Sequence, residues 1–147
     1  MDSSEQTDAV PGAGSNAVSV TEHWFGGLSQ ADFEIDLYER ISARQPADIR
    51  CLRILGELYA RAGRFDQALA IDRRLIAILP NDAIVVYNLA CSLAMNGAAE
   101  AALAQLDRAL ELGYLDFSHL EIDPDLESVR QLPQFAELLK KYAVPSA

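Results

Sequence analysis

Hydrophobic residues in the middle of the chain recur three and four positions apart, which is the spacing of one face of an α-helix. Residues 49–62 and 65–79 each carry such a face and are predicted to form two helices. The packing positions of the first helix, including a small residue where another helix must come close, are Leu52, Leu55, Gly56 and Tyr59. Gly63 is predicted to end this helix, because glycine tolerates the left-handed conformation of a C-terminal cap. Pro80 is predicted to end the second.

The same pattern returns 34 residues later, so that residues 83–116 match residues 49–82. The matched pairs are Leu52 with Val86, Leu55 with Leu89, Gly56 with Ala90, Gly63 with Gly97, Ala68 with Ala102 and Ile76 with Leu110. A repeat of this length predicts helix–turn–helix hairpins, each of which covers its apolar face by stacking on its neighbours. The predicted fold class is therefore all-α.

Residues 21–46 are predicted to form a degenerate leading repeat. Pro46 lies 34 residues before the proline that closes the first full repeat, so it marks the end of a helix. Tyr38 and Ile41 share the predicted inward face of this helix. It stays open whether residues 21–28 form a helix of their own, because two glycines weaken the pattern there.

Residues 117–142 are predicted to form a degenerate terminal repeat that caps the stack. Asp123 followed by Pro124 is typical of a helix start, since aspartate accepts hydrogen bonds from backbone N–H groups and proline fits the first turn. Pro133 is predicted to start a last helix with one apolar and one polar face. Its apolar face is Phe135, Leu138, Leu139 and Tyr142, and its polar face is Gln134, Glu137 and Lys140. The chain is predicted to hold about seven to eight helices, followed by a short tail at 143–147.

These residues resemble the tetratricopeptide repeat family, whose 34-residue unit has a small residue in each helix, a turn glycine and a closing proline. The matching residues are Leu52, Leu55, Gly56, Tyr59, Gly63, Ala68 and Pro80 in the first unit, and Val86, Leu89, Ala90, Leu93, Gly97, Ala102 and Ala109 in the second. Leu75 and Tyr114 depart from the pattern, where the family prefers alanine and proline. The G-Y-x-D-F, D-P-D-L and R-x-x-P-x-F runs of residues 113–135 also resemble a segment that follows the last repeat in many bacterial members.

The resemblance implies a right-handed α–α superhelix whose concave groove, lined by the first helix of each hairpin, binds a peptide or a protein surface. The groove face lies opposite the packing face, and helical geometry places one stripe of side chains on it. The predicted groove residues are Arg50, Arg53, Glu57, Arg61, Tyr87, Asn88, Cys91 and Met95, with Ile84 at the start of the second stripe. Residues 40–74 carry eight arginines against four acidic residues, so an acidic partner segment with an apolar anchor is expected.

Composition narrows the classes of function. The 147 residues carry 12 Lys+Arg against 22 Asp+Glu, a net charge of −10, which argues against a general nucleic-acid partner. No apolar run is long enough to span a membrane, and residues 1–20 lack the basic start and apolar stretch of a secretory signal. Those twenty residues are expected to be a disordered acidic leader. With two cysteines, the chain is expected to be cytoplasmic.

No catalytic, cofactor or metal site is predicted. His23 and His119 are far apart, and Cys51 and Cys91 lack metal-ligand spacing. The acidic residues from Asp116 to Glu127 lack the glycine and ligand spacing of a calcium loop, so they are interpreted as helix caps and a solvated face.

The chain is therefore predicted to be a non-enzymatic adaptor or scaffold. A small acidic secretion-type chaperone for an export substrate is the alternative. A monomer or a weak homodimer is expected, with the His-Trp-Phe run at 23–25 as the feature that would mediate self-association.

Overall fold

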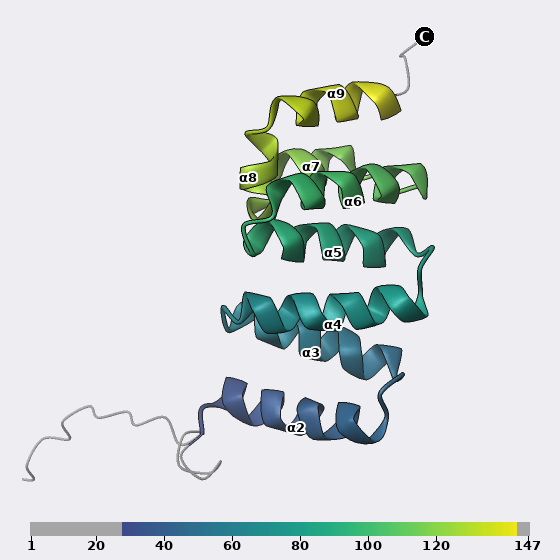
Figure 1. The fold of residues 1–147 in the computed structure, drawn as a ribbon. Coiled ribbons are helices and arrows are strands. Elements are labelled where there is room, and N and C mark those ends of the chain that lie inside the picture. The colour runs from purple at the N-terminus through teal and green to yellow at the C-terminus, as the bar shows by residue number, and fades with distance from the viewer. Residues whose placement is uncertain (1–27, 144–147) are drawn as a thin grey trace, which may run out of the picture.

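The structure is a computed structural model that describes residues 28–143. In this range eight α-helices and one 3₁₀ turn follow one another without a strand. The elements are α2 (Gln30–Arg44), α3 (Ile49–Arg61), α4 (Phe65–Ile78), α5 (Ala83–Met95), α6 (Ala99–Glu111), α7 (Phe117–Ile122), η1 (Pro124–Leu126), α8 (Glu127–Arg130) and α9 (Pro133–Tyr142). Each of the helices from α2 to α5 contacts the next one along the chain, and the stack rises from α2 to α9 (Figure 1). The predicted all-α solenoid is confirmed.

Several sequence predictions fall on residues that the structure does not describe. These are the acidic leader at 1–20, the segment 21–27 with its His-Trp-Phe run, and residues 144–147. The sequence left open whether residues 21–28 form a helix; of these, the structure describes only residue 28, which lies outside any helix.

The helices keep the 34-residue period to the end of the chain. The first helices of three successive units begin at Ile49, Ala83 and Phe117. The second helices begin at Phe65, Ala99 and Pro133. The terminal segment is therefore a third unit in register, and α2, which ends just before Pro46 as predicted, is the second helix of a leading unit.

An aspartate at the same period starts each first helix. Asp48, Asp82 and Asp116 are the N-cap residues of α3, α5 and α7. Each carboxylate accepts a hydrogen bond from the backbone N–H three residues later, at 3.0–3.1 Å. These bonds satisfy N–H groups that have no partner within the helix.

Gly63 and Gly97 end the first helices as predicted. Their φ angles are +72° and +79°, in the left-handed region that disfavours residues with a Cβ atom. The next backbone N–H then bonds to the carbonyl five residues earlier, from Arg64 to Tyr59 and from Ala98 to Leu93, both at 2.9 Å. This is the Schellman arrangement, which reverses the chain into the second helix.

The core consists of two clusters along the stack. One joins α3 and α4 with Ile35 of α2 and Val85 of α5, and the other joins the remaining buried residues of α5 and α6 with the terminal unit. The role predicted for Gly56 is confirmed, because a Cβ atom there would lie only 3.2 Å from the Ile71 Cγ2 atom of α4. The inward face predicted for α2 is only partly right. Ile35 is its most buried apolar residue at 2% exposed, whereas Tyr38 and Ile41 are half-buried.

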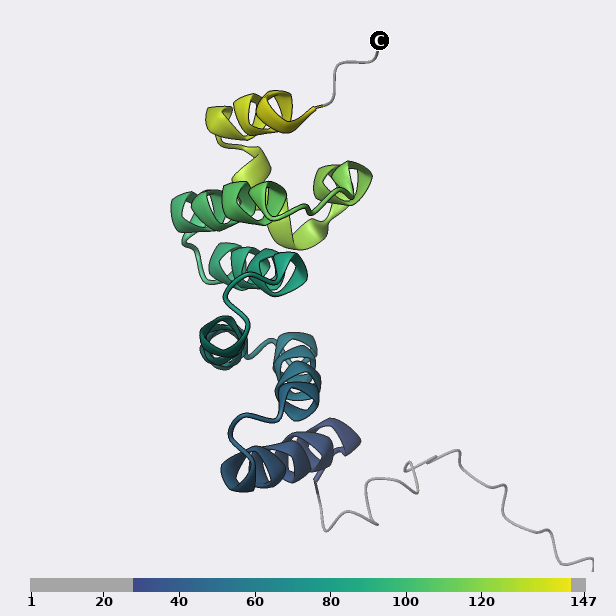
Figure 2. The same ribbon diagram turned by 90° about the vertical axis from the view of Figure 1, so that its right-hand side faces the viewer.

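In the terminal unit, the first helix is broken. Pro124 lacks an N–H and interrupts the ladder, so the chain forms α7, η1 and α8 where the other units have one helix (Figure 2). Its inward residues Leu120, Leu126 and Val129 have no exposed surface. Asp123 caps η1 as predicted, by accepting from the Asp125 backbone N–H at 3.0 Å.

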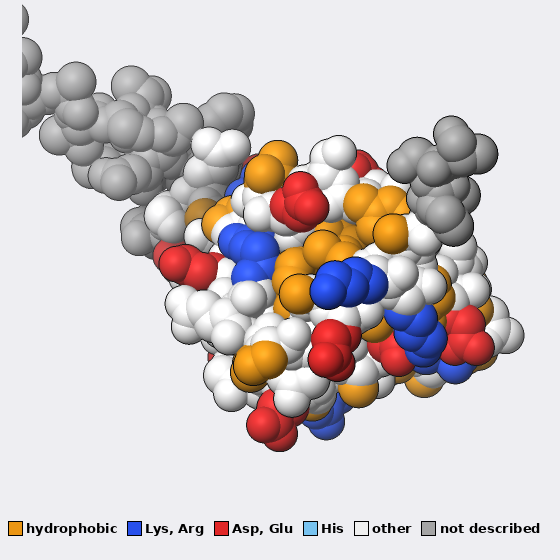
Figure 3. Space-filling view, turned by 90° about the horizontal axis from the view of Figure 1, so that it is seen from above, with side chains coloured by type: hydrophobic (Ala, Val, Ile, Leu, Met, Phe, Trp, Pro, Cys, Tyr) orange, Lys and Arg blue, Asp and Glu red, His pale blue; other side chains and the backbone are white. Residues whose placement is uncertain are grey.

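The last helix, α9, covers α6 as a cap. Phe135 and Leu138 are buried, Leu139 and Tyr142 are half-buried, and the predicted polar face is exposed. Seen from this end of the stack, hydrophobic side chains are interspersed with charged ones (Figure 3). Within residues 28–143, the helices are too short or too polar to cross a membrane.

Candidate functional site

A groove runs between the first helices α3 and α5, and η1 borders it through Asp125. Its larger hollow has a volume of about 380 Å³. The lining residues come from α3, α4, α5 and η1: Arg53, Gly56, Glu57, Ala60, Asp72, Leu75, Ile84, Asn88, Cys91, Ser92 and Asp125. A second hollow of about 260 Å³ shares Ala60, Cys91, Ser92 and Asp125 with the first and adds Arg61, Phe65, Ala68 and Met95. Because the two hollows share these residues, they form one continuous groove.

Six of the eight residues predicted for the groove line it. They are Arg53, Glu57, Arg61, Asn88, Cys91 and Met95. The reason is the helical period, since Leu52, Leu55 and Tyr59 turn one side of α3 into the core and leave the opposite side open. Arg50 is exposed near the start of α3 but lies outside both hollows.

Two of the groove arginines are paired with acidic residues. The Arg53 guanidinium lies 3.7 Å from the carboxylate of Asp82, the N-cap residue of α5. Arg61 bonds to Glu57 one turn earlier on α3. All four side chains are more than one-third exposed, so each pair contributes little to stability and a ligand carboxylate can compete for the arginine.

Tyr87 is not an open groove residue, contrary to the prediction. Its side chain is 5% exposed, and its ring stacks on Tyr114 with centroids 4.3 Å apart and planes at 4°. Its hydroxyl donates a hydrogen bond to Asp123. The sequence pattern placed Tyr87 correctly on the groove side of α5, but the turn around η1 folds over this part of the helix and buries it. Cys91 is also buried, at 9% exposed, although it borders both hollows.

Asp72 is a groove residue that the sequence analysis missed. It projects from α4 to the floor of the groove, is 9% exposed and accepts a hydrogen bond from the Ser92 hydroxyl of α5. Burial raises the pKa of this carboxyl to about 6, although the hydrogen bond from Ser92 acts in the opposite direction. The repeat indicates that position 72 faces inward, because the equivalent residue 34 positions later is Leu106, which is fully buried.

Where η1 borders the groove, five polar side chains meet in what we call the Asp123 cluster. Its members are Tyr87, Cys91, His119, Asp123 and Asp125. The Asp123 Oδ2 atom accepts from the Tyr87 hydroxyl, lies 3.7 Å from the donating Cys91 thiol and lies 3.2 Å from His119 Nε2. The cluster therefore ties α5 to α7 and η1.

Burial and the acidic surroundings suppress ionisation in this cluster. The pKa of the Tyr87 hydroxyl and that of the Cys91 thiol both lie well above their ordinary values, chiefly because burial disfavours the charged forms. Nearby negative charge from Asp123 adds to both shifts. At neutral pH both groups therefore keep their protons and act as hydrogen-bond donors.

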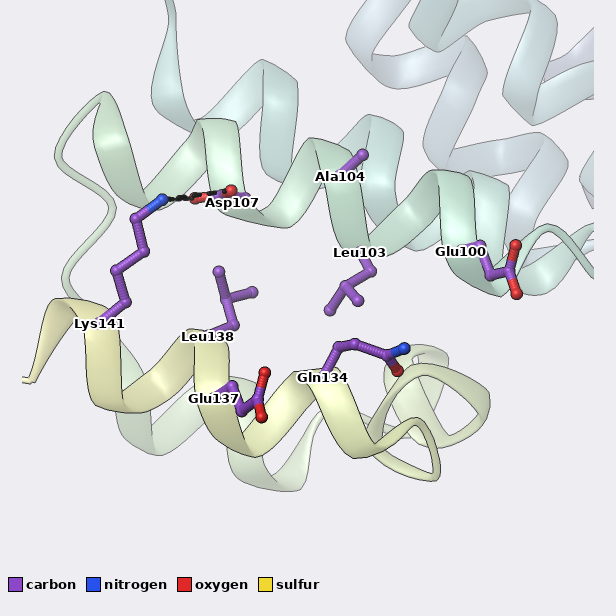
Figure 4. A pocket seen from close by; sticks show the side chains of 8 residues that line it. All are labelled: Glu100, Leu103, Ala104, Asp107, Gln134, Glu137, Leu138 and Lys141. Atoms are coloured by element: carbon purple, nitrogen blue, oxygen red, sulfur yellow. Dashed lines mark hydrogen bonds and ion pairs between the residues drawn. The ribbon is translucent and has the colours of Figure 1, made fainter.

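A separate hollow of about 350 Å³ lies between the second helices α6 and α9. Leu103 and Leu138 point into it from the two helices, and Lys141 bonds to Asp107 at one end (Figure 4). This hollow shares no lining residue with the groove. It is lined by only two helices, whereas the groove is lined by three helices and η1.

Comparison with known proteins aligns part of the chain. No family model matches it. A stretch of 90 residues is 31% identical to a chloroplastic protein of Arabidopsis thaliana. The alignment covers 59% of this chain but 27% of that relative, so the chain spans little more than a quarter of the relative's length.

Proposed function

We propose that the protein is a non-enzymatic adaptor that holds a peptide or a protein surface in the groove between α3 and α5. The observation that carries the proposal is the continuity of the two hollows along successive first helices. A groove of this kind presents side chains from two repeats to one extended ligand. We also propose that the protein acts in the cytoplasm.

The groove offers both apolar and basic contacts. Ile84 is 58% exposed and Met95 is 36% exposed, so both apolar side chains are open to a ligand in the groove. Arg53 and Arg61 lie on the facing helix. We therefore infer a partner segment that has an apolar anchor flanked by carboxylates. Apolar residues of the partner would contact Ile84 in one hollow and Met95 in the other, because Tyr87 is buried.

Site-specific crosslinking tests the proposal. A photo-crosslinking residue at Asn88, which is exposed in the groove, should capture a partner from source-cell lysate, and mass spectrometry of the crosslinked peptide should identify an acidic segment with an apolar residue. The same group at Arg73, an exposed position of α4 outside both hollows, is the matched control.

Variants that change charge and polarity test whether the crosslinked partner binds in the groove. Arg53→Glu combined with Ile84→Asp should abolish the crosslink from Asn88. Arg73→Glu combined with Leu115→Asp makes the same chemical changes at exposed positions outside the groove and should leave the crosslink intact. Equal capture from Arg73 and Asn88, or capture that survives the groove variant, would contradict the groove assignment. Circular dichroism shows whether each variant is folded.

A further inference from the structure

The Asp123 cluster brings together a thiol, an imidazole and two carboxylates from three elements. Cys91 comes from α5, His119 from α7, Asp123 from the residue before η1, and Asp125 from η1 itself. One possible ligand atom from each of Cys91, Asp123 and Asp125 lies within 4.8 Å of the other two. His119 Nε2 lies 3.2 Å from Asp123 Oδ2.

The spacing of these atoms resembles that of a tetrahedral metal site. With Zn–S near 2.3 Å and Zn–N and Zn–O near 2.0–2.1 Å, tetrahedral ligand atoms lie about 3.3–3.6 Å apart. The measured separations are 3.2 Å between the His119 nitrogen and the Asp123 oxygen, and 3.7 Å between the Cys91 sulfur and the same oxygen. Cys91, Asp123 and Asp125 already lie within 4.8 Å of one another, whereas the His119 nitrogen lies close to Asp123 alone of the three, so the imidazole must move toward Cys91 and Asp125 to complete the shell around a cation.

We propose that Cys91, His119, Asp123 and Asp125 form a binding site for a zinc-class divalent cation that locks the terminal unit to α5. Thiolate and imidazole ligands favour Zn²⁺ over Ca²⁺ and Mg²⁺, which prefer oxygen ligands alone. Four protein ligands would complete a tetrahedral shell, as in structural rather than catalytic zinc sites. This proposal does not depend on the adaptor function.

The surroundings of the cluster support a cation. Tyr87 donates a hydrogen bond to Asp123, and such a contact orients a ligating carboxylate. Cys91 and Asp125 line the groove, which gives a hydrated ion a route to the site.

Binding requires the loss of one proton. The hydrated cation releases water molecules, the Cys91 S–H bond breaks, and its proton passes to solvent as the sulfur–metal bond forms. The two carboxylates and the neutral imidazole donate lone pairs. The hydrogen bond from the Cys91 thiol to Asp123 and the close contact of His119 Nε2 with Asp123 are thereby replaced by bonds to the shared ion, with the imidazole proton carried on Nδ1, while the Tyr87 hydroxyl keeps its bond to Asp123.

This site differs from the expectation drawn from the sequence, which predicted no metal ligands. Cys91 and Asp123 are 32 residues apart and belong to different repeats, so no local motif joins them. Stacking of the third unit on the second brings them together.

Cobalt binding by the full-length chain tests the proposal. After metal is stripped with a chelator, Co²⁺ should bind with one-to-one stoichiometry and give a thiolate-to-cobalt charge-transfer band together with the strong visible bands of tetrahedral Co²⁺. Zn²⁺ should displace the cobalt, because it binds such ligands more tightly. Tyr87→Phe should weaken the affinity about 10-fold or more, as expected for the loss of a group that orients a ligand.

Matched variants separate this site from adventitious binding. Cys91→Ser should lose the charge-transfer band, whereas Cys51→Ser, which changes the other buried cysteine, should keep it. Asp125→Asn alters an exposed residue and should weaken cobalt binding without unfolding the protein. The proposal is wrong if the wild type shows no stoichiometric band, if the band survives Cys91→Ser, or if only the weak bands of octahedral Co²⁺ appear.

Discussion

The Arg74 guanidinium donates a hydrogen bond of 2.9 Å to the carbonyl oxygen of Pro46, 28 residues earlier in the chain. The same contact recurs one repeat later, where Arg108 donates to the carbonyl oxygen of Pro80 at 3.1 Å. The 34-residue period therefore extends from core positions to a polar contact that joins α4 and α6 to the turns before their hairpins. Neither arginine could be assigned this role from hydrophobic spacing.

Replacement of either arginine by alanine should destabilise the fold to a similar extent. Each substitution removes one hydrogen bond to a backbone carbonyl, which is worth about 1 kcal/mol. Arg108→Ala should cost slightly more, since Arg108 also donates to the Asn81 side chain at 3.0 Å. Urea unfolding measures the effect, with Arg73→Ala, an exposed neighbour, expected to stay within about 0.5 kcal/mol of the wild type. A larger effect at Arg73 would contradict this assignment.

Asp72 should make stability fall as pH rises. Its folded-state pKa of about 6 lies above the ordinary value of 3.8, so the folded state binds the proton more tightly than the unfolded chain does. The stabilisation from this protonation is complete below about pH 4 and is lost as the pH rises to about 6, with a total of roughly 2–3 kcal/mol. Asp72→Asn cannot ionise. The free energy of unfolding of this variant, minus that of the wild type, should therefore increase between these pH values.

Ser92→Ala provides a second test of how stability depends on pH through Asp72. The Ser92 hydroxyl favours the ionised form of Asp72, so its removal should raise the pKa of Asp72 further and extend the decline in stability to higher pH. Denaturant unfolding at a series of pH values measures both variants. A difference between Asp72→Asn and the wild type that does not change with pH would show that Asp72 has its ordinary pKa.

Gly97 should tolerate asparagine better than alanine. Its φ angle is +79°, and a Cβ atom there would meet no heavy atom within 4 Å, so the cost of substitution lies in the backbone alone. Gly97→Ala should cost about 1–2 kcal/mol, and Gly97→Asn less, because asparagine enters the left-handed region more readily. Thermal or urea unfolding would compare the two. Equal losses would mean that the turn adopts another conformation in solution.

Asp82 has two separable roles. As the N-cap residue of α5 it accepts from two backbone N–H groups, and it also pairs with Arg53 in the groove. Asp82→Ala should cost about 1 kcal/mol, whereas Asp82→Asn keeps a capping oxygen and should cost much less. Because Asp82→Asn releases Arg53 from its carboxylate, it should also tighten binding of the acidic peptide recovered by crosslinking at Asn88. Calorimetric titration measures this change, and unchanged or weaker binding would argue against a role for Arg53.

Residue pattern alone predicts the repeats well, because helix packing depends on local spacing. The starts of α5 and α9, the glycine turns and the close approach at Gly56 all follow from it. The burial of Tyr87 could not be predicted in this way, since it depends on how the chain folds back at η1. The Asp123 cluster was missed for the same reason. Asp72 differs, because comparison with Leu106 at the equivalent position would have located it on the buried face.

The terminal unit should unfold together with the second repeat rather than separately. Val129 of α8 has no exposed surface and belongs to the same core cluster as most buried residues of α5 and α6, whereas α3 and α4 contribute their buried residues to the second cluster, which includes Val85 of α5. Val129→Ala leaves a cavity in that shared core and should cost about 1–3 kcal/mol. In a stack of repeats, destabilisation spreads mainly to the neighbouring unit. Hydrogen exchange should therefore become faster in α5 and α6 by a larger factor than in α3 and α4. Faster exchange confined to α7–α9 would show instead that the cap opens independently of the repeat it covers.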